Sequence, residues 1–223
     1  MPRFFPIGGG RAVASGLVGV YREQVVPRMV EWMCGAAGMD RWRSQAVDGL
    51  SGRVVEIGFG SGLNVPHYPP DVDVVLAVEP SATARRLAER RIRESSVRVE
   101  HVGLDGQEIP LDDSSCDSAL FTFTLCTVPD PAQALHEVRR VLRPEGSVHF
   151  LEHGLSPDPG VAKWQRRIDP FQRRLADGCH LTRDSPALVE RAGFVMRRSE
   201  QLYVRGPKPW SWFTIGVAVK PAG

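Results

Sequence analysis

The sequence predicts an α/β domain with a doubly wound, mostly parallel sheet of seven strands, and three observations carry this prediction. Between residues 53 and 152, short runs rich in β-branched residues alternate with longer segments of helical periodicity. The runs are apolar on both faces, which is typical of parallel strands that helices cover on both sides. After residue 193 two further runs have no helix between them, so we expect an antiparallel C-terminal hairpin at the sheet edge.

The N-terminal part, residues 1–45, is expected to be a helical extension or lid ahead of a main domain at residues 46–223. Two prolines and "GGG" near the start favour a loosely docked beginning. From Val18 to Met39 apolar residues recur at helical spacing, which predicts one or two helices. With 223 residues and 42% hydrophobic content, the chain can bury one sizeable core.

The main domain follows the alternating order of strand and helix along the chain. The expected parallel strands are "RVVEI", "DVVLAV", "VRVEHV", "DSALFTF" and "SVHFLE". The helical segments include "ATARRLAERRIRE" and "PAQALHEVRRVLR", and the hairpin is "GFVMRRSEQLYV" with "WFTIGVAVK". Right-handed crossovers bring the carboxyl ends of the parallel strands to one edge, where ligands bind in such sheets.

Charge and composition exclude several classes of function. The formal net charge of +2 is nearly balanced, so we expect no nucleic-acid partner. The four cysteines have no close paired spacing, which predicts neither a disulfide framework nor a metal site and fits a reducing cytoplasm. The apolar stretch "AVASGLVGVY" is far shorter than the ~20 residues that span a bilayer, and no cleavage site follows it. We therefore expect a cytoplasmic protein.

A glycine-rich stretch, "VVEIGFGSGLN" at residues 54–64, follows the first strand. Gly58, Gly60 and Gly62 allow a tight turn with exposed amides, which suits a nucleotide-like ligand. The dinucleotide pattern GxGxxG would need glycine in place of Leu63. Glu56 before the first glycine would repel a pyrophosphate and would suit a ligand with a positively charged amino group. A plain turn between strand and helix is the alternative interpretation.

Two further acids follow the next two strands. Glu79 lies about 20 residues beyond the loop, where a carboxylate accepts hydrogen bonds from both ribose hydroxyls. Asp105 could accept an adenine amino proton, while the Gly106 amide serves a ring nitrogen. Either acid could instead be a solvated loop residue. Three acids at three successive strand ends favour a nucleoside ligand.

These residues resemble those of the class I S-adenosylmethionine-dependent methyltransferases, in the ubiquinone/menaquinone methyltransferase-like group. The similar segments are "VVEIGFGSG", "AVEPS", "GLDGQEIPLDDSSCDSA" and "EVRRVLRPEGSVHFLEH". Others resemble the methyltransferase-like seven proteins, described as alkyl thiol S-methyltransferases: "YREQVVPR", "TLCTVPDP", "FLEHG", "DPFQRRLADGCHLTRDS" and "GVAVK". The resemblance implies a Rossmann-like fold, S-adenosylmethionine as cofactor and S-adenosylhomocysteine as product.

The resemblance also implies where each cofactor group binds. The methionine part would lie at Glu56 and the glycine loop, the ribose at Glu79, and the sulfonium beside Thr122. The full expected cofactor set is Tyr21, Glu56, Gly58, Phe59, Gly60, Gly62, Asn64, Glu79, Pro80, Asp105, Gly106 and Thr122. Departures from the family are Phe59 for a common cysteine, Ser61 for threonine and Glu79 for aspartate. Family members carry a hydrophobic N-terminal anchor that we do not find here, so membrane residence is not carried over.

Methyl transfer from a sulfonium is an in-line displacement that mainly requires alignment and the exclusion of water. Candidate catalytic groups are His153 at the end of the fifth strand, with Asp177 and His180 in "ADGCHLTRD". Each could instead be structural, as a buried histidine or a helix cap. Cys126 and Cys179 are far apart in sequence, so we expect small apolar roles rather than a metal or covalent one. The arginine pairs at 85–86 and 90–91 are expected to form a solvated helix face.

The expected acceptor is a small lipophilic molecule, a thiol first and a hydroxyl, amine or quinol carbon next. Its pocket is expected between the N-terminal helices, the segment 164–182 and the "GPKPWSW" loop. The alternatives are a phospholipid or quinone methyltransferase at a membrane surface, and a cofactor-binding protein without turnover. The membrane-surface enzyme is the runner-up among enzymes, the non-catalytic protein comes from a different class, and the sequence leaves the oligomeric state open.

Overall fold

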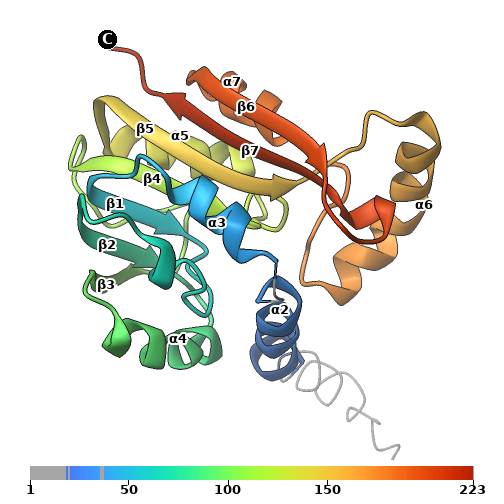
Figure 1. The fold of residues 1–223 in the computed structure, drawn as a ribbon, viewed down its shortest axis with the longest axis horizontal. Helices are drawn as coiled ribbons and strands as arrows, with labels where there is room; N and C mark the ends of the chain where they lie inside the picture. The colour runs from blue at the N-terminus through green and yellow to red at the C-terminus, as the bar shows by residue number, and fades with distance from the viewer. Residues whose placement is uncertain (1–18, 20, 36–37, 223) are drawn as a thin grey trace, which may run out of the picture.

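The computed structural model describes residues 19, 21–35 and 38–222 and contains one seven-stranded sheet (Figure 1). The strand order is β3-β2-β1-β4-β5-β7-β6, with β7 antiparallel to β5 and β6 and the other neighbours parallel. The predicted fold class, including the C-terminal hairpin, is therefore confirmed. Predictions for residues 1–18 lie outside the described residues.

The strands occupy the runs that the sequence singled out. Their bounds are β1 Gly52–Ile57, β2 Val72–Val78, β3 Arg98–Gly103, β4 Cys116–Thr122, β5 Leu142–His153, β6 Val195–Tyr203 and β7 Trp212–Val219. From β1 the chain adds β2 and β3 on one side and β4 and β5 on the other. The strand order therefore reverses between β1 and β4, and a crevice opens beyond the carboxyl ends of such a pair.

The helices connect and cover these strands. They are α2 Val26–Cys34, α3 Asp40–Val47, α4 Ala82–Glu94, α5 Pro131–Val141, α6 Pro159–Leu175 and α7 Ser185–Arg191, with short helical turns η1 Tyr21–Val25, η2 Val65–His67 and η3 Lys208–Trp210. The side chains of Ser81, Asp130, Asp158 and Asp184 accept backbone N–H groups at the starts of α4, α5, α6 and α7. Such caps satisfy donors that a helix cannot satisfy itself, and so they fix where these helices begin.

The core has a layer on each face of the sheet. Val55 and Phe121 pack in a cluster with Leu135 and Val189 of α5 and α7. Val54, next to Val55 on β1, packs instead in a cluster that includes Val47 of α3. Adjacent strand residues thus point to opposite layers, which explains why the parallel strands read as continuous apolar runs.

α2 lies beside the sheet edge at which the parallel strands end, whereas α3 crosses one face of the sheet (Figure 1). Trp42 and Ala46 of α3 pack in a buried cluster with Phe213 and Ile215 of β7. The boundary predicted after residue 45 therefore falls inside a helix that is part of the core. Among the described residues, no helix combines the length and apolar character needed to cross a bilayer.

Candidate active site

The glycine loop follows β1 directly and depends on conformations that other residues rarely adopt. Gly58, Gly60 and Gly62 have φ angles of 71°, 59° and 72°, in the left-handed region. A Cβ atom on Gly58 would lie 2.3 Å from the hydroxyl oxygen of Thr124. Among the described residues, a Cβ atom on Gly60 would have only the Gly58 carbonyl oxygen within 4 Å, at 3.8 Å. Gly58 is therefore required for packing, whereas the described part of the chain leaves space beside Gly60.

Glu79 joins the end of β2 to this loop. Its Oε2 atom accepts the Gly60 N–H at 2.8 Å, and its Oε1 atom accepts the Ser81 N–H at 2.8 Å. Glu79 is only 7% exposed, and burial raises the pKa of its carboxyl while the amide bonds act against that rise. The predicted ribose acid thus lies beside the predicted cofactor loop.

Two arginines that were expected on a solvated face hold this region in place. Arg85 donates to the Glu79 carbonyl oxygen at 2.6 Å. Arg91 donates to the Ser61 carbonyl oxygen at 3.0 Å and pairs with Glu31 of α2 at 2.7 Å. The expectation of a solvated helix face was wrong for Arg85 and Arg91, because their side of α4 faces the glycine loop and α2.

Glu56 is fully buried at the end of β1. The Asn64 amide donates to it at 2.6 Å and also to Thr122 Oγ1 at 2.9 Å, and the Tyr68 hydroxyl donates to its other oxygen. Arg43 of α3, also buried, donates to Asn64 Oδ1 at 2.8 Å. Burial raises the pKa of Glu56 to about 7, although the Tyr68 and Asn64 bonds and Arg43 lower it.

Sequence reasoning missed Arg43 and Tyr68, because one of two arginines on a polar helix and a tyrosine before two prolines carry no spacing signal. The structure joins both, through Glu56 and Asn64, to Thr122. Three of the expected cofactor residues are thereby placed in one hydrogen-bonded network between β1 and β4.

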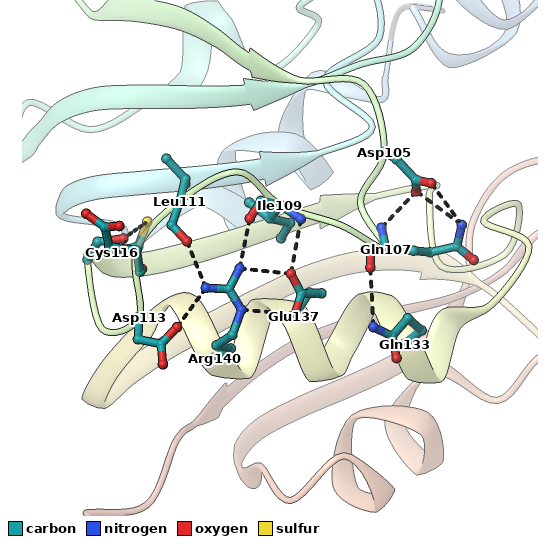
Figure 2. A network of polar contacts seen from close by, with 11 residues as sticks. Asp105, Gln107, Ile109, Leu111, Asp113, Cys116, Gln133, Glu137 and Arg140 are labelled. Atoms are coloured by element: carbon teal, nitrogen blue, oxygen red, sulfur yellow. Dashed lines mark hydrogen bonds and ion pairs between the residues drawn. The ribbon is translucent and has the colours of Figure 1, made fainter.

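The segment after β3 is fixed by polar contacts to α5 (Figure 2). Asp105 is exposed and accepts the Gln107 N–H at 2.8 Å. Further along, Arg140 donates to the carbonyl oxygens of Leu111 and Ile109, each at 2.8 Å. Gly106 is buried, and a Cβ atom there would lie 2.4 Å from Cγ2 of Ile57. These contacts hold Asp105 beside the end of β1.

Other members of the expected cofactor set lie around the same edge with different roles. The Phe59 side chain is 3% exposed and packs in the core, so only its backbone faces the loop. Pro80 is exposed and follows Glu79. The Tyr21 hydroxyl donates to the Leu175 carbonyl oxygen at 2.7 Å and links η1 to the end of α6. Leu104, which sequence reasoning missed, is 61% exposed beside Asp105.

His153 lies at the end of β5 and does not stand alone. Its Nε2 atom is 3.1 Å from Sγ of Cys179, which is 3.9 Å from Sγ of Cys126. The distance of these cysteines in sequence predicted neither a metal nor a covalent role, but the fold brings both thiols to one histidine. Phe123, after β4, stacks on the His153 ring with centroids 6.4 Å apart.

The other two catalytic candidates lie in the loop between α6 and α7. The His180 ring is 3.8 Å from the Asp169 carboxylate, and burial lowers its pKa. Asp177 has a left-handed φ of 45° and helps turn the chain toward Cys179. His153 differs from His180 in that its ring lies 3.1 Å from a thiol rather than beside a carboxylate.

The reversal of strand order, the glycine loop and the acids at three strand ends together define a S-adenosylmethionine-dependent methyltransferase. A family model described as a methyltransferase domain matches residues 55–150. The chain is 35% identical to thiol S-methyltransferase TMT1B of Homo sapiens over 180 residues, 77% of this chain and 71% of that relative. It is 34% identical to TMT1B of Rattus norvegicus over 169 residues, 73% of this chain and 66% of that relative.

A solved structure, Haemonchus contortus phosphoethanolamine N-methyltransferase 2 in complex with S-adenosyl-L-methionine, has a TM-score of 0.65 at 15% identity. The match covers 91% of this chain and 59% of that one, and it supports the fold. The chain belongs to the class I S-adenosylmethionine-dependent methyltransferases, in the family of the thiol S-methyltransferases above. Its cofactor is S-adenosylmethionine.

Replacing Glu79 by alanine is expected to weaken cofactor binding by roughly 1.5–3 kcal/mol, the range for hydrogen bonds to a charged group. The alanine variant has no carboxylate to bind the ribose hydroxyls or to accept the Gly60 N–H of the loop. Isothermal titration calorimetry measures this loss. Glu89→Ala on α4, where the side chain is 61% exposed, is the matched control and should bind normally. A loss below a few tenths of a kcal/mol for Glu79→Ala would remove Glu79 from the ribose site.

Affinity for S-adenosylmethionine is expected to rise as pH increases through about 7, the pKa of Glu56. The deprotonated Glu56 carboxylate attracts the positively charged donor. Cofactor affinity changes roughly tenfold for each unit by which cofactor binding shifts the pKa of Glu56. The stability of the free enzyme should move the other way. The Glu56 contribution is full below its ordinary pKa of 4.5 and is lost as pH rises through about 7.

Calorimetry and denaturant unfolding across this pH range check both trends. In Glu56→Gln, which keeps the shape without the titration, both slopes should flatten. Equal slopes in the two proteins would show that another group titrates.

Proposed function

We propose that the enzyme transfers the methyl group of S-adenosylmethionine to the sulfur of a small lipophilic thiol. The observation that carries this proposal is the 35% identity to a thiol S-methyltransferase over 77% of the chain. The acceptor thiolate attacks the methyl carbon, its new C–S bond forms as the bond to the sulfonium breaks, and S-adenosylhomocysteine leaves. The thiol proton is released to solvent.

Exposed apolar side chains near the crevice support a lipophilic acceptor. Trp32 of α2 is 79% exposed, and Phe171 and Leu175 of α6 are 67% and 63% exposed. Both helices lie on the side toward which the parallel strands point (Figure 1). Burying such side chains against an apolar acceptor would be favourable.

A separate surface pocket of about 260 Å³ lies between residues 154–157, residues 183–186 and the hairpin. Trp212 and Gln201 contribute to its lining, and no residue of the described glycine loop does. The pocket is therefore not the donor site. The Trp212 ring packs edge-on against the Tyr203 ring, with the two ring centroids 4.9 Å apart.

The test is incubation with S-adenosylmethionine labelled in its methyl group and a panel of thiols, each matched by an alcohol and an amine of the same carbon skeleton. Mass spectrometry should find the label on sulfur, with higher kcat/KM for the more lipophilic thiols. Liposomes that present phospholipid or quinol acceptors form a further arm. If the label appears on lipid and not on the thiols, the membrane-surface alternative replaces this proposal. If the protein binds the cofactor but transfers no methyl group in any arm, it is a non-catalytic protein.

We further propose that the protein is cytoplasmic, that it has no nucleic-acid partner and that it acts without a membrane surface. The near balance of charge, with a net charge of +2, supports the second. Fractionation of cells that express the tagged chain tests the first and third. Recovery in the membrane fraction would contradict both.

A further inference from the structure

Three side chains with soft or borderline metal-binding atoms converge beyond the ends of β4 and β5. One ligand atom each from Cys126, His153 and Cys179 lies within 4.8 Å of the others. Cys126 follows β4, His153 ends β5, and Cys179 comes from the loop between α6 and α7. Segments separated by 26 and 53 residues thus meet at one point.

Backbone contacts hold the three segments in register. The Cys126 N–H donates to the buried Glu152 carboxylate at 3.2 Å, and Glu152 is the neighbour of His153 on β5. The Cys126 carbonyl oxygen accepts the His180 N–H at 2.8 Å, which fixes the loop that carries Cys179. The two cysteines and the histidine are therefore positioned by main-chain bonds that do not depend on their own side chains.

The separations suit a tetrahedral ion bound by two sulfurs and one nitrogen. Bonds of about 2.3 Å to thiolate sulfur place two such ligands roughly 3.8 Å apart around Zn²⁺. The observed distance between the two sulfurs is 3.9 Å. The same geometry sets sulfur and imidazole nitrogen roughly 3.5 Å apart, and the His153 to Cys179 distance is 3.1 Å. Small rotations of the Cys179 and His153 side chains would admit the ion.

The protein leaves part of this cluster unsatisfied. His153 Nδ1 is buried and has no hydrogen-bond partner among the described residues. Cys126 is 1% exposed, whereas His153 and Cys179 are half-buried. The core therefore closes the cluster on the side of Cys126, and its partly exposed members are His153 and Cys179.

We propose that Cys126, His153 and Cys179 form a site for a thiophilic divalent cation such as Zn²⁺, whose fourth position binds the acceptor thiol. Three protein ligands with one open position are typical of catalytic rather than structural zinc. This role rests on the proposed thiol methylation. The acceptor thiol loses its proton to solvent as it binds the ion, and its sulfur then attacks the methyl carbon while the bond to the sulfonium breaks. The ion returns unchanged when the thioether leaves.

The position of the cluster fits this role. Phe123 lies between it and the network of the cofactor site, with its ring stacked on His153 and the Arg43 guanidinium 5.8 Å from its centroid. Arg43 in turn binds Asn64, which binds Thr122 at the end of β4. The cluster of Cys126, His153 and Cys179 and the residues expected around the sulfonium are thus neighbours at one sheet edge.

Metal binding is tested first, apart from activity. The full chain, stripped of metal under reducing conditions, is titrated with Co²⁺ and with Zn²⁺. We expect one equivalent of each, with thiolate-to-cobalt charge-transfer absorption in the near ultraviolet. Cys179→Ser, Cys126→Ala and His153→Gln should each weaken binding by at least about 100-fold, more than the loss of a supporting contact costs. Cys34→Ser, which removes a thiol outside the cluster, should keep one equivalent with the same spectrum.

Circular dichroism checks that each variant is folded, and the titration of the unaltered protein stands if one of them is not. Binding of no cobalt by the reduced, folded protein would overturn the site. After air oxidation, a disulfide between Cys126 and Cys179 would lower the mass of the protein by two hydrogen atoms. That result, together with no metal uptake by the reduced protein, would replace the metal site by a redox-active cysteine pair.

The catalytic role is tested by thiol methylation with and without the ion. At pH 7 the metal-free enzyme should lose at least about tenfold in kcat/KM, because a free thiol of pKa near 8.5 is mostly protonated. The loss should shrink above the thiol pKa, and S-adenosylmethionine affinity should not change. Full activity of the metal-free enzyme would refute the role of the ion and leave thiol methylation standing. One bound metal with no thiol methylated would refute the proposed function and support the site alone.

Discussion

Replacing Gly60 by valine is expected to abolish measurable cofactor binding, with a loss of at least about 100-fold or roughly 2.8 kcal/mol. Gly60 has a φ of 59°, and a Cβ atom there would meet no side chain of the described residues within 4 Å. A branched side chain would fill the space that the cofactor needs. It would also disfavour the loop conformation whose N–H reaches Glu79.

The control is Gly38→Val, because Gly38 also has a positive φ, of 108°, and no heavy atom of the described residues lies within 4 Å of its Cβ position. It lies before α3, outside the loop, and so it carries backbone strain without a role at the site. Calorimetry should find normal affinity in Gly38→Val and none in Gly60→Val, with both proteins folded by circular dichroism. Unchanged affinity in Gly60→Val would disprove the assignment of this loop to the cofactor.

The second large effect is on stability, where Glu152→Ala should lower the free energy of unfolding by roughly 3 kcal/mol. The buried Glu152 carboxylate accepts the N–H groups of Thr124, Leu125 and Cys126 at 2.7, 2.8 and 3.2 Å. Each buried donor left without a partner costs about 1–3 kcal/mol, and water entering the gap offsets part of that. The turn after β4 depends on this one side chain.

Chemical denaturation measures the change, and the exposed Glu200→Ala on β6 is the matched control, expected within roughly 0.5 kcal/mol of the unaltered protein. Glu152→Gln should fall between the two, since an amide retains one accepting oxygen. If Glu152→Ala is as stable as the control, the turn is held by other contacts. Cys126 is carried on this turn, so metal uptake by Glu152→Ala should also weaken.

A buried carboxylate and a buried arginine in one network give the site its electrostatic character. Glu56 and Arg43 do not pair directly but share Asn64, whose amide donates to the acid and whose oxygen accepts from the base. The burial that raises the pKa of Glu56 also lowers that of Arg43. A positively charged donor that enters this crevice would favour the charged form of Glu56, which couples its binding to a deprotonation.

The local features were readable from the sequence because each has a short-range cause. Continuous apolar runs separated by helical periods predicted the parallel strands, and the absence of a helix after residue 193 predicted the hairpin. The spacing of Gly58, Gly60 and Gly62 predicted a turn of unusual backbone angles, and all three have positive φ. Glu56 lies at the end of β1, and Glu79 and Asp105 follow β2 and β3, so the parallel order of these strands brings the three acids to one edge of the sheet.

Other features failed because their causes are long-range. Arg85 and Arg91 looked like solvated charge in the sequence of α4, yet they donate to Glu79 and Ser61, because only tertiary packing decides which side of a helix faces a loop. Arg43 and Tyr68 were missed for the same reason. Tyr68 donates to Glu56 at the end of β1, and Arg43 reaches the same acid only through Asn64.

By itself, the sequence determined the strand and helix order, the glycine turn and the membership of the methyltransferase class, since these rest on residue type and spacing over a few dozen positions. Only the tertiary structure decided that Cys126, His153 and Cys179 meet, and that Glu152 holds the turn between them. Spacing along a chain is no measure of distance once parallel strands bring their ends to one edge, and so the chemistry of that edge is fixed by the fold.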